Sequence, residues 1–290
     1  MDGIIIINKE TGYTSHDVIA VLRKVLNTKK IGHIGTLDPN ARGVLPVLIG
    51  QATKVSKYLM EHDKTYVAKI CLGEKRDTGD SEGNIIETMD IHKLNLNRED
   101  IEKTLLTFIG KQKQTPPIYS AIKVEGKKLY EYAREKKEVE ISKRDIEIYN
   151  IRFIKYIKNE ITFEAKCSKG TYIRTLVEDI AEKLGTVGYM KELERTAVDK
   201  FTINDAITIE EIKNNPKLVE ENLITVEEAF DDNEGITLDL RKLELFLNGV
   251  KITLEKEEGL YKIYSNEKGN NRFIGLGIVK NNLLKRDVII

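Results

Sequence analysis

The order of apolar and polar residues predicts a chain that mixes strands and helices from its start. The uninterrupted β-branched run of residues 4–7 lies between Gly3 and Asn8 and is typical of a short strand buried on both faces. Ser15 then favours the start of an amphipathic helix over residues 16–26. Its apolar residues recur at the i, i+3, i+4, i+7 spacing of one helical face, at Val18, Val21, Leu22 and Val25.

Strict alternation predicts further strands in the middle of the chain. Residues 66–72 place Tyr66 and three more apolar side chains on one face, and residues 160–167 alternate in the same way. Residues 146–157 precede the second of these runs, separated from it by Lys158-Asn159. We therefore expect these two runs to form a β-hairpin.

Capping and stop residues predict three more helices. One is expected within residues 45–58, directly after a loop rich in glycine and proline. Asn97 is a capping residue for a second helix, which ends before Gly110. Thr171 is a plausible N-cap for a third helix, which stops at Gly185.

The last third of the chain predicts a separate small module. Residues 186–230 contain only shorter pieces, including a small helix near Ile209, and residues 231–235 form a polar, acidic break that is the best domain boundary. A helix over residues 238–247 and three strand-like runs follow, at residues 260–264, 272–279 and 283–290. A unit of under about 60 residues is marginal alone, so we expect it to pack on the main body.

Composition requires that any site for nucleic acid be local. The 290 residues contain 47 Lys and Arg against 47 Asp and Glu, so no overall field attracts nucleic acid or a membrane. Hydrophobic residues make up 40% and charged residues 32%, as in an ordinary globular protein. The length allows one large domain, or a large domain and a small one.

The two cysteines and the first residues predict a reduced, cytoplasmic protein. Cys71 and Cys167 lie far apart, and neither has a Cys or His at metal-ligand spacing, which argues against a zinc site or a disulfide framework. We expect both to be core residues of strands. Residues 1–8 lack a basic segment, and their apolar run is too short for a signal sequence or a membrane span.

One irregular stretch, residues 32–46, concentrates residues that shape loops. It contains three glycines and two of the five prolines. Asp38 immediately precedes Pro39, which forces extended backbone at Asp38 and holds its carboxylate on a stiff segment. From these residues alone, an ordinary Asp-Pro turn is the alternative explanation.

Residues 111–144 combine many lysines and arginines with three tyrosines, Tyr119, Tyr130 and Tyr132. Interspersed glutamates favour a solvated helix face. The same residues also suit an arm that grips RNA, because lysines meet phosphates and aromatic rings stack on bases. Composition alone leaves both interpretations open.

Arg174 occupies an unfavourable place in its predicted helix. It falls in the first turn after Thr171, where the helix dipole favours acidic residues. A misfit of this kind marks function more often than stability. We therefore expect Arg174 to have a partner outside its own helix.

Seven stretches, in order along the chain, carry a resemblance to a known family. They are Asn8-Lys9 with Gly12 and Thr14-Ser15; Gly32-His33 through Gly35, Leu37-Asp38-Pro39 and Gly43-Val44-Leu45-Pro46; Lys64-Thr65-Tyr66; Asp77-Thr78 with Asp80; Pro117-Ile118-Tyr119-Ser120-Ala121; Gly126-Lys127-Lys128-Leu129-Tyr130; and Cys167-Ser168-Lys169-Gly170-Thr171-Tyr172-Ile173-Arg174. Over most of residues 3–205 the sequence resembles the bacterial tRNA pseudouridine-55 synthases of the TruB family.

The resemblance implies an α+β fold and two domains. The expected architecture is a mixed, largely antiparallel central sheet flanked by helices, the pseudouridine synthase fold. Residues 1–230 would form the catalytic domain, with an RNA-gripping arm inserted at residues 112–145. Residues 235–290 would form a small, mostly β module similar to the RNA-binding module called PUA.

The resemblance also implies roles for individual residues. Asp38 would be the catalytic aspartate, Arg174 its basic partner and Tyr66 the aromatic partner of the target base. The other implied substrate-binding residues are His33, Lys9, Tyr172, Leu193, Lys127 and Lys128. Lys9 and His33 would contact RNA or brace the catalytic loop. Without the resemblance, Tyr66 reads as a core residue and His33 as a brace.

Two departures from the family pattern affect this site. Glu10 stands where the family usually has proline, which is expected to loosen the turn at Lys9. Glu194 stands between Leu193 and Arg195 where a second basic residue is typical, which weakens the case for a phosphate contact there.

The implied reaction is an isomerisation of uridine to pseudouridine at position 55 in the T arm of tRNA, with no cofactor, metal or protein partner and with a monomeric enzyme. Glycosidases normally use two carboxylates, whereas one ionised carboxylate held in a dry pocket suffices here. Two other classes compete with this interpretation. A non-catalytic RNA binder would not need Asp38, and a small-molecule enzyme with a glycosidase-like acid would need a second carboxylate near it.

Overall fold

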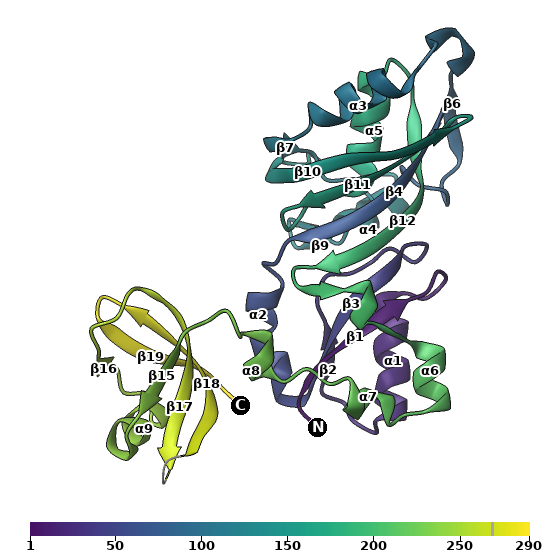
Figure 1. The fold of residues 1–290 in the computed structure, drawn as a ribbon. Coiled ribbons are helices and arrows are strands. Elements are labelled where there is room, and N and C mark those ends of the chain that lie inside the picture. Colours follow the sequence, from purple (N-terminus) through teal and green to yellow (C-terminus); the bar gives the residue numbers. More distant parts are fainter. Residues whose placement is uncertain (268–269) are drawn as a thin grey trace.

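The computed structural model describes residues 1–267 and 270–290. In the described chain, a ten-stranded sheet runs through the main body in the order β14-β1-β3-β12-β4-β11-β10-β7, with β2 paired to β3 and β13 to β12 (Figure 1). The strands of this sheet are β1 (Gly3–Lys9), β2 (Ile31–His33), β3 (Arg42–Ile49), β4 (Lys64–Leu72), β7 (Gly110–Gln114), β10 (Arg144–Ile157), β11 (Glu160–Cys167), β12 (Gly188–Val198), β13 (Phe201–Thr202) and β14 (Ile207–Thr208).

The sheet is mixed but largely antiparallel, as the resemblance implied. β1 pairs in parallel with β14, and β3 pairs in parallel with β12. The predicted hairpin of β10 and β11 is confirmed, with Ile157 opposite Glu160. The central strand β12 joins the two halves of the sheet, because it contacts β3 on one side and β4 on the other.

Short helices cover the sheet at both of its ends. In Figure 1, α1 and α6 lie beside β1, while α3 and α5 lie beside β10 and β11. The helices of the main body are α1 (Ser15–Val25), α2 (Ser56–Leu59), α3 (Arg98–Leu106), α4 (Leu129–Arg134), α5 (Ile173–Lys183), α6 (Ile209–Asn214), α7 (Leu218–Glu221) and α8 (Val226–Ala229), with 3₁₀ turns η1 (Gly50–Val55), η2 (Ile91–Leu94) and η3 (Ile203–Asp205). Two small hairpins complete it, β5 (Glu74–Arg76) with β6 (Ile85–Thr88) and β8 (Lys123–Val124) with β9 (Lys127–Lys128).

The C-terminal residues form a second sheet with its own core. Its strand order is β15-β17-β18-β19-β16, and α9 packs on it. The elements are β15 (Gly235–Leu238), α9 (Leu240–Leu247), β16 (Ile252–Thr253), β17 (Gly259–Glu267), β18 (Asn270–Lys280) and β19 (Leu283–Ile289). Phe246 and Ile263 are fully buried in this core.

The C-terminal sheet is fastened to the main body beside α2 and α8 (Figure 1). Leu276 and Val288 join a hydrophobic cluster of the main body that includes Phe230. Asp287 accepts a hydrogen bond from the Tyr58 hydroxyl at 2.5 Å and forms an ion pair with Lys57 at 2.6 Å. The expectation that this small unit packs on the main body is therefore confirmed.

Four local predictions were wrong. The helix expected in residues 45–58 begins only at Gly50, because the apolar run before it is buried in β3 and pairs with β1. Residues 186–198 are not short pieces but include the long strand β12. The N-cap of α1 is Thr14 rather than Ser15, and that of α5 is Tyr172 rather than Thr171.

Candidate active site

The loop that carries Asp38 connects β2 to β3. These two strands pair antiparallel, so the loop leaves the sheet at His33 and returns at Arg42. Gly43 sits where the loop returns, with a φ of +104°, and a Cβ there would lie 2.2 Å from the Arg195 carbonyl oxygen. Only glycine fits this position, because both the backbone angle and the close approach exclude a side chain.

Asp38 and Arg174 form an ion pair, as the resemblance implied, so Arg174 has a partner outside its own helix, as its misfit there predicted. The Arg174 Nε lies 3.2 Å from Asp38 Oδ2, and Nη2 lies 3.4 Å from Oδ1. The same guanidinium donates to the carbonyl oxygens of Thr78 at 3.2 Å and Tyr119 at 2.9 Å. The Arg174 side chain is only 7% exposed, whereas that of Asp38 is 37% exposed, so the carboxylate remains open to a ligand.

Asp80 is a further residue of this cluster, which sequence reasoning had placed only within a matching stretch. Its Oδ2 lies 3.8 Å from Arg174 Nη1, and its Oδ1 accepts a hydrogen bond from Thr78 at 2.6 Å. Arg174 therefore lies between two carboxylates, one open and one buried. A small cavity beside them is lined by both aspartates and by Leu193.

Burial and charge act on Asp38 in opposite directions. Burial raises the pKa of this carboxyl above its usual 3.8, Arg174 lowers the pKa, Asp80 raises it and Lys9 lowers it. Burial is the largest of these effects, so the net direction is upward. Arg174 and Lys9 therefore oppose the effect of burial and favour the ionised form of the carboxyl.

Lys9 supports the Asp38 loop from beneath. It is fully buried, and its Nζ donates to the carbonyl oxygens of Tyr13 at 2.6 Å, Glu10 at 3.0 Å and Pro39 at 3.1 Å. Burial lowers the pKa of Lys9 to about 8. Of the two implied roles for Lys9, the geometry supports bracing, and the turn is held by these bonds although Glu10 replaces proline.

Arg195 is a second buried cation beneath the loop, and sequence reasoning missed it. It is 1% exposed and lies on β12, two residues beyond Leu193 and so on the same face of the strand. Its Nη2 donates to the Gly35 carbonyl oxygen at 2.9 Å and its Nε to the Val44 carbonyl oxygen at 2.7 Å. Arg195 thereby ties together the two ends of the Asp38 loop.

Tyr66 lies on β4 directly opposite Arg195 in the sheet register and is half-buried against the core. Burial raises the pKa of its hydroxyl, and the positive charge of Arg195 opposes that rise. Tyr172 is fixed at the start of α5, where its backbone exchanges two hydrogen bonds with the Gln114 side chain. Neither tyrosine lines the small cavity beside Asp38.

Glu194 is the second residue that departs from the family pattern, and its negative charge is balanced by a neighbouring arginine. Its carboxylate pairs with Arg42 at 3.0 Å, at the end of the Asp38 loop. The pair lies at the surface, beside a second small pocket that also contains Leu193. Glu194 therefore neutralises a cation at the rim of the site.

His33 packs edge-on against His16, with ring centroids 5.4 Å apart. Burial lowers the pKa of His33 to about 4, and the charges of His16 and Arg195 act in the same direction. Among the described residues, its buried Nδ1 has no hydrogen-bond partner. His33 is therefore neutral at pH 7, which suits contact with a flat, uncharged group.

His33→Gln is expected to make the fold less sensitive to acid. The His33 pKa is about 4 in the folded protein, against about 6.5 in an unfolded chain. Between these values the unfolded state binds more protons, so stability is lost as the pH falls from 6.5 towards 4. Urea unfolding at pH 7 and pH 4.5 should show that the wild type loses on the order of 1–3 kcal/mol more than the variant. Equal losses would contradict the assignment.

The basic stretch at residues 111–144 is not one long helix, and its first residues belong to the main sheet rather than to a separate arm. Residues 110–114 form β7 at the edge of the main sheet, and the remainder holds the hairpin of β8 and β9 and the short helix α4. The Lys127 ammonium lies 2.5 Å from Glu135 and 4.9 Å from the centre of the Tyr132 ring, and that of Lys128 lies 5.4 Å from the centre of the Tyr130 ring. Both lysines lie on β9, and these contacts are with residues 130–135 of the same segment.

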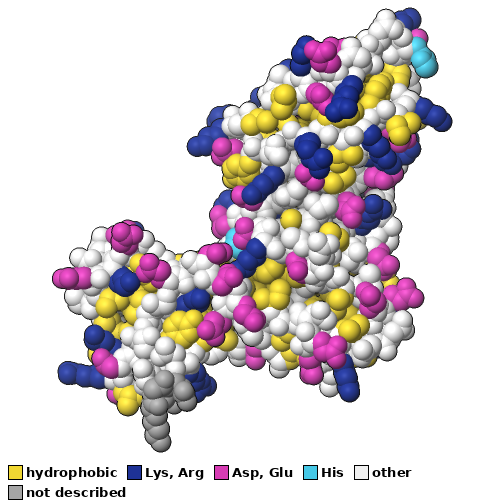
Figure 2. All heavy atoms as spheres, viewed as in Figure 1, with side chains coloured by type: hydrophobic (Ala, Val, Ile, Leu, Met, Phe, Trp, Pro, Cys, Tyr) yellow, Lys and Arg dark blue, Asp and Glu magenta, His cyan; other side chains and the backbone are white. Residues whose placement is uncertain are grey.

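On the face drawn in Figure 2, Lys and Arg are not spread evenly, although the totals balance. In Figure 2, Lys and Arg are frequent over the end of the main sheet with β10 and β11, and Asp and Glu gather over the end with α6 and α7.

Within the described residues, no group of three or more His, Cys, Asp or Glu is placed to hold a metal ion. No helix among them is long and apolar enough to cross a membrane.

Comparison with known sequences finds two family matches. Residues 23–173 match the TruB family pseudouridylate synthase (N terminal domain), and residues 174–239 match the tRNA pseudouridylate synthase B C-terminal domain. A protein of Alkaliphilus oremlandii named tRNA pseudouridine synthase B is 43% identical over 288 residues, covering 97% of this chain and 94% of that protein. One of Staphylococcus aureus with the same name is 48% identical over 217 residues, covering 73% and 71%.

Solved structures share the fold. A chain in the structure of an H/ACA RNP bound to a substrate RNA containing 2′-deoxyuridine superposes with a TM-score of 0.71 at 23% identity, covering 99% of this chain and 83% of that chain. A chain of a Cbf5-Nop10-Gar1 complex gives the same TM-score at 24% identity, with the same coverage. The predicted α+β architecture is thus confirmed by comparison as well as by topology.

Proposed function

Since this chain belongs to the TruB family of pseudouridylate synthases, we propose that it converts uridine to pseudouridine at position 55, in the T loop of tRNA. The observation that carries the proposal is the contact between Asp38 and Arg174 at 3.2 Å. Asp38 lies on a loop that Arg195 holds at both ends. The reaction breaks the bond from N1 to C1′, turns the base over and joins C5 to C1′. Its product has the same composition as its substrate.

Asp38 is the residue that we assign to the bond rearrangement. A single ionised carboxylate serves as nucleophile or base, provided that it keeps its charge away from water. Burial favours the neutral acid, and the guanidinium of Arg174 offsets this by favouring the carboxylate. The 37% exposure of the Asp38 side chain leaves it accessible to a nucleoside that enters from outside.

The target uridine must leave the stacked T loop to reach Asp38. Unstacking costs a few kcal/mol, and stacking on an aromatic ring returns roughly 1–3 kcal/mol per base. We assign this stacking to Tyr66 and a contact with displaced nucleotides to the neutral His33. Tyr172 and Leu193 complete the pocket in this proposal.

The proposal is tested by incubating the purified protein with an unmodified tRNA transcript and mapping pseudouridine along it. We expect pseudouridine at position 55 and no release of free base. A transcript with cytidine at position 55 is the matched control and should remain unmodified. Absence of pseudouridine from the wild-type transcript would overturn the proposal, and activity on free uridine would favour the small-molecule enzyme instead.

The arm lysines are expected to contribute to binding rather than to chemistry. Replacing Lys123, Lys127 and Lys128 together with alanine should weaken tRNA binding and make the plot of log K against log salt shallower by about 0.7–0.9 for each phosphate that is no longer neutralised. The single-turnover rate at saturating tRNA should stay near that of the wild type. Three exposed lysines on the α1 and α7 side, Lys24, Lys29 and Lys217, make a control of equal charge. Equal binding by both triple variants would place the RNA elsewhere.

We further propose that the protein acts alone, as a cytoplasmic monomer, with tRNA as its partner and residues 235–290 as an RNA-binding module. The main-body site contains its carboxylate, its arginine and its aromatic residues within one chain. Gel filtration at assay concentration and activity of the purified chain test these points. A requirement for a second protein would contradict them.

A further inference from the structure

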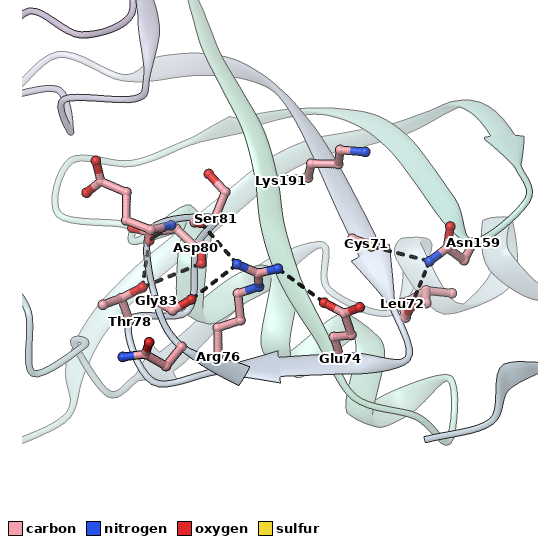
Figure 3. Close-up of polar contacts among 12 residues, drawn as sticks. Cys71, Leu72, Glu74, Arg76, Thr78, Asp80, Ser81, Gly83, Asn159 and Lys191 are labelled. Atoms are coloured by element: carbon pink, nitrogen blue, oxygen red, sulfur yellow. Dashed lines mark hydrogen bonds and ion pairs between the residues drawn. The ribbon is translucent and has the colours of Figure 1, made fainter. Parts of the chain in front are cut away.

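Arg76 lies at the end of β5 and organises the loop that follows it (Figure 3). Its Nη1 donates to the carbonyl oxygens of Ser81 and Gly83, both at 3.1 Å, and its Nη2 lies 3.2 Å from a Glu74 oxygen. The guanidinium also stacks over the Tyr189 ring on β12, 4.3 Å from the ring centre. The Arg76 side chain is 20% exposed, so it is mostly covered by these neighbours.

The loop held in this way, residues 77–83, supplies two of the groups that hold Arg174. The Thr78 carbonyl oxygen accepts from Arg174 Nη1 at 3.2 Å, and Asp80 lies 3.8 Å from the same atom. Asp80 is in turn oriented from within the loop, since its Oδ1 accepts from the Thr78 hydroxyl and from the Glu82 backbone N–H at 3.0 Å (Figure 3). Arg76 therefore holds the loop, and the loop in turn holds Arg174.

Arg76 bonds to the far end of the loop and so restrains the segment that carries Asp80. The loop starts at Arg76 itself and returns to it at Ser81 and Gly83, so the guanidinium closes the loop into a ring. One further bond, from the Met190 N–H to the Gly79 carbonyl oxygen at 3.0 Å, joins the loop to β12. Without the Arg76 side chain, the backbone bonds that remain within the loop, such as Asp77 N–H to the Asn84 carbonyl oxygen at 3.1 Å, fix its turn. The Met190 bond and the contacts with Arg174 would then be left to hold the loop against the rest of the site.

We propose that Arg76 is a positioning residue for the reaction, which acts through the loop of residues 77–83 to hold Arg174 against Asp38. The proposal rests on the proposed function. It assigns Arg76 no contact with the substrate. A planar guanidinium is needed because only this group bonds two carbonyl oxygens and a carboxylate while stacking on a ring.

A shift in the pH profile separates this role from a purely structural one. The charged groups that face Asp38 are Arg174, Asp80 and Lys9. If Arg174 moves away, burial dominates and the Asp38 pKa rises, so the acid limb of the single-turnover rate moves to higher pH. A variant that is merely less stable loses folded protein but leaves the acid limb of the remaining enzyme in place.

The test compares Arg76→Met and Arg76→Lys with Arg98→Met and with wild type. Arg98 is the matched control, because it stacks over Phe153 at 5.3 Å and pairs with Glu102 at 2.8 Å, away from the loop. We expect Arg76→Met to lower the single-turnover rate at saturating tRNA about tenfold. It should also move the acid limb of the pH–rate profile to higher pH and leave the affinity for tRNA unchanged. Arg76→Lys should lie between it and wild type. Arg98→Met should match wild type in all three readouts.

A rate and an acid limb in folded Arg76→Met equal to those of wild type would overturn the inference. If that variant does not fold, Arg76→Lys decides in the same way, because its charge and stem keep the packing on Tyr189. Failure of the proposed function is distinguishable, since wild type and Arg98→Met would then also form no pseudouridine.

Discussion

Asp38→Asn is expected to abolish pseudouridine formation, with the single-turnover rate falling about 10⁴-fold or more. The amide has the shape of the carboxylate but can neither attack carbon nor accept a proton at neutral pH. One of its two contacts with Arg174 survives, as a hydrogen bond from the guanidinium to the amide oxygen, so we expect the loop to keep its place. Binding of tRNA should be within a few-fold of wild type, because the charge removed is negative and faces a polyanion.

Tritium release from tRNA labelled at C5 of uridine measures this prediction, because C5 loses its hydrogen when it bonds to C1′. Asp231→Asn is the matched control, since Asp231 is an exposed aspartate outside the arm that also pairs with a cation, Lys200. That variant should release tritium at the wild-type rate. Unchanged release by Asp38→Asn would show that the catalytic assignment is wrong and would favour the non-catalytic RNA binder.

Arg174→Lys is expected to lower the rate about 10²-fold although the positive charge is kept. The guanidinium contacts Asp38 at two atoms and donates to two backbone carbonyl oxygens, of Thr78 and Tyr119. An ammonium has a single nitrogen and cannot reach these partners together. The carboxylate would lose its fixed orientation, and buried carbonyl groups would lose their donors.

Single-turnover kinetics on saturating tRNA measure the loss, and thermal unfolding separates it from a loss of folded protein. Arg152→Lys is a suitable control, because Arg152 pairs with Glu164 at 3.3 Å on the exposed surface of the sheet. We expect that variant to be as active as wild type. Turnover by Arg174→Lys within about twofold of wild type would contradict the need for a planar partner.

Local patterns were enough to predict much of the fold. The alternation in β4 and β11 and the β-branched run in β1 are properties of a few neighbouring residues, and these strands lie where they were expected. The central strand β12 escaped prediction because two register shifts against β4 break its alternation, and because its burial is set by partners from both halves of the chain. Such pairing is not encoded in a short window.

The same distinction applies to the site. Asp38 and Arg174 each stood out locally, one before a proline and one against a helix dipole, although they are 136 residues apart. Arg195 and Lys9 gave no such local signal, because the sequence does not show whether an arginine or lysine is buried or exposed. The position of Arg195 two residues after an apolar Leu193 on one strand was the one available hint.

The attachment of the C-terminal sheet has a consequence for substrate choice. Lys57 and Tyr58, which bond Asp287, follow β3 after a few residues of η1, and β3 begins where the Asp38 loop ends. If both parts bind RNA as proposed, the span between them is set before the RNA arrives. Binding a tRNA of matching shape then costs no entropy of domain ordering, whereas an RNA of another length must distort to satisfy both contacts. The enzyme would thus discriminate by geometry as well as by the sequence of the loop.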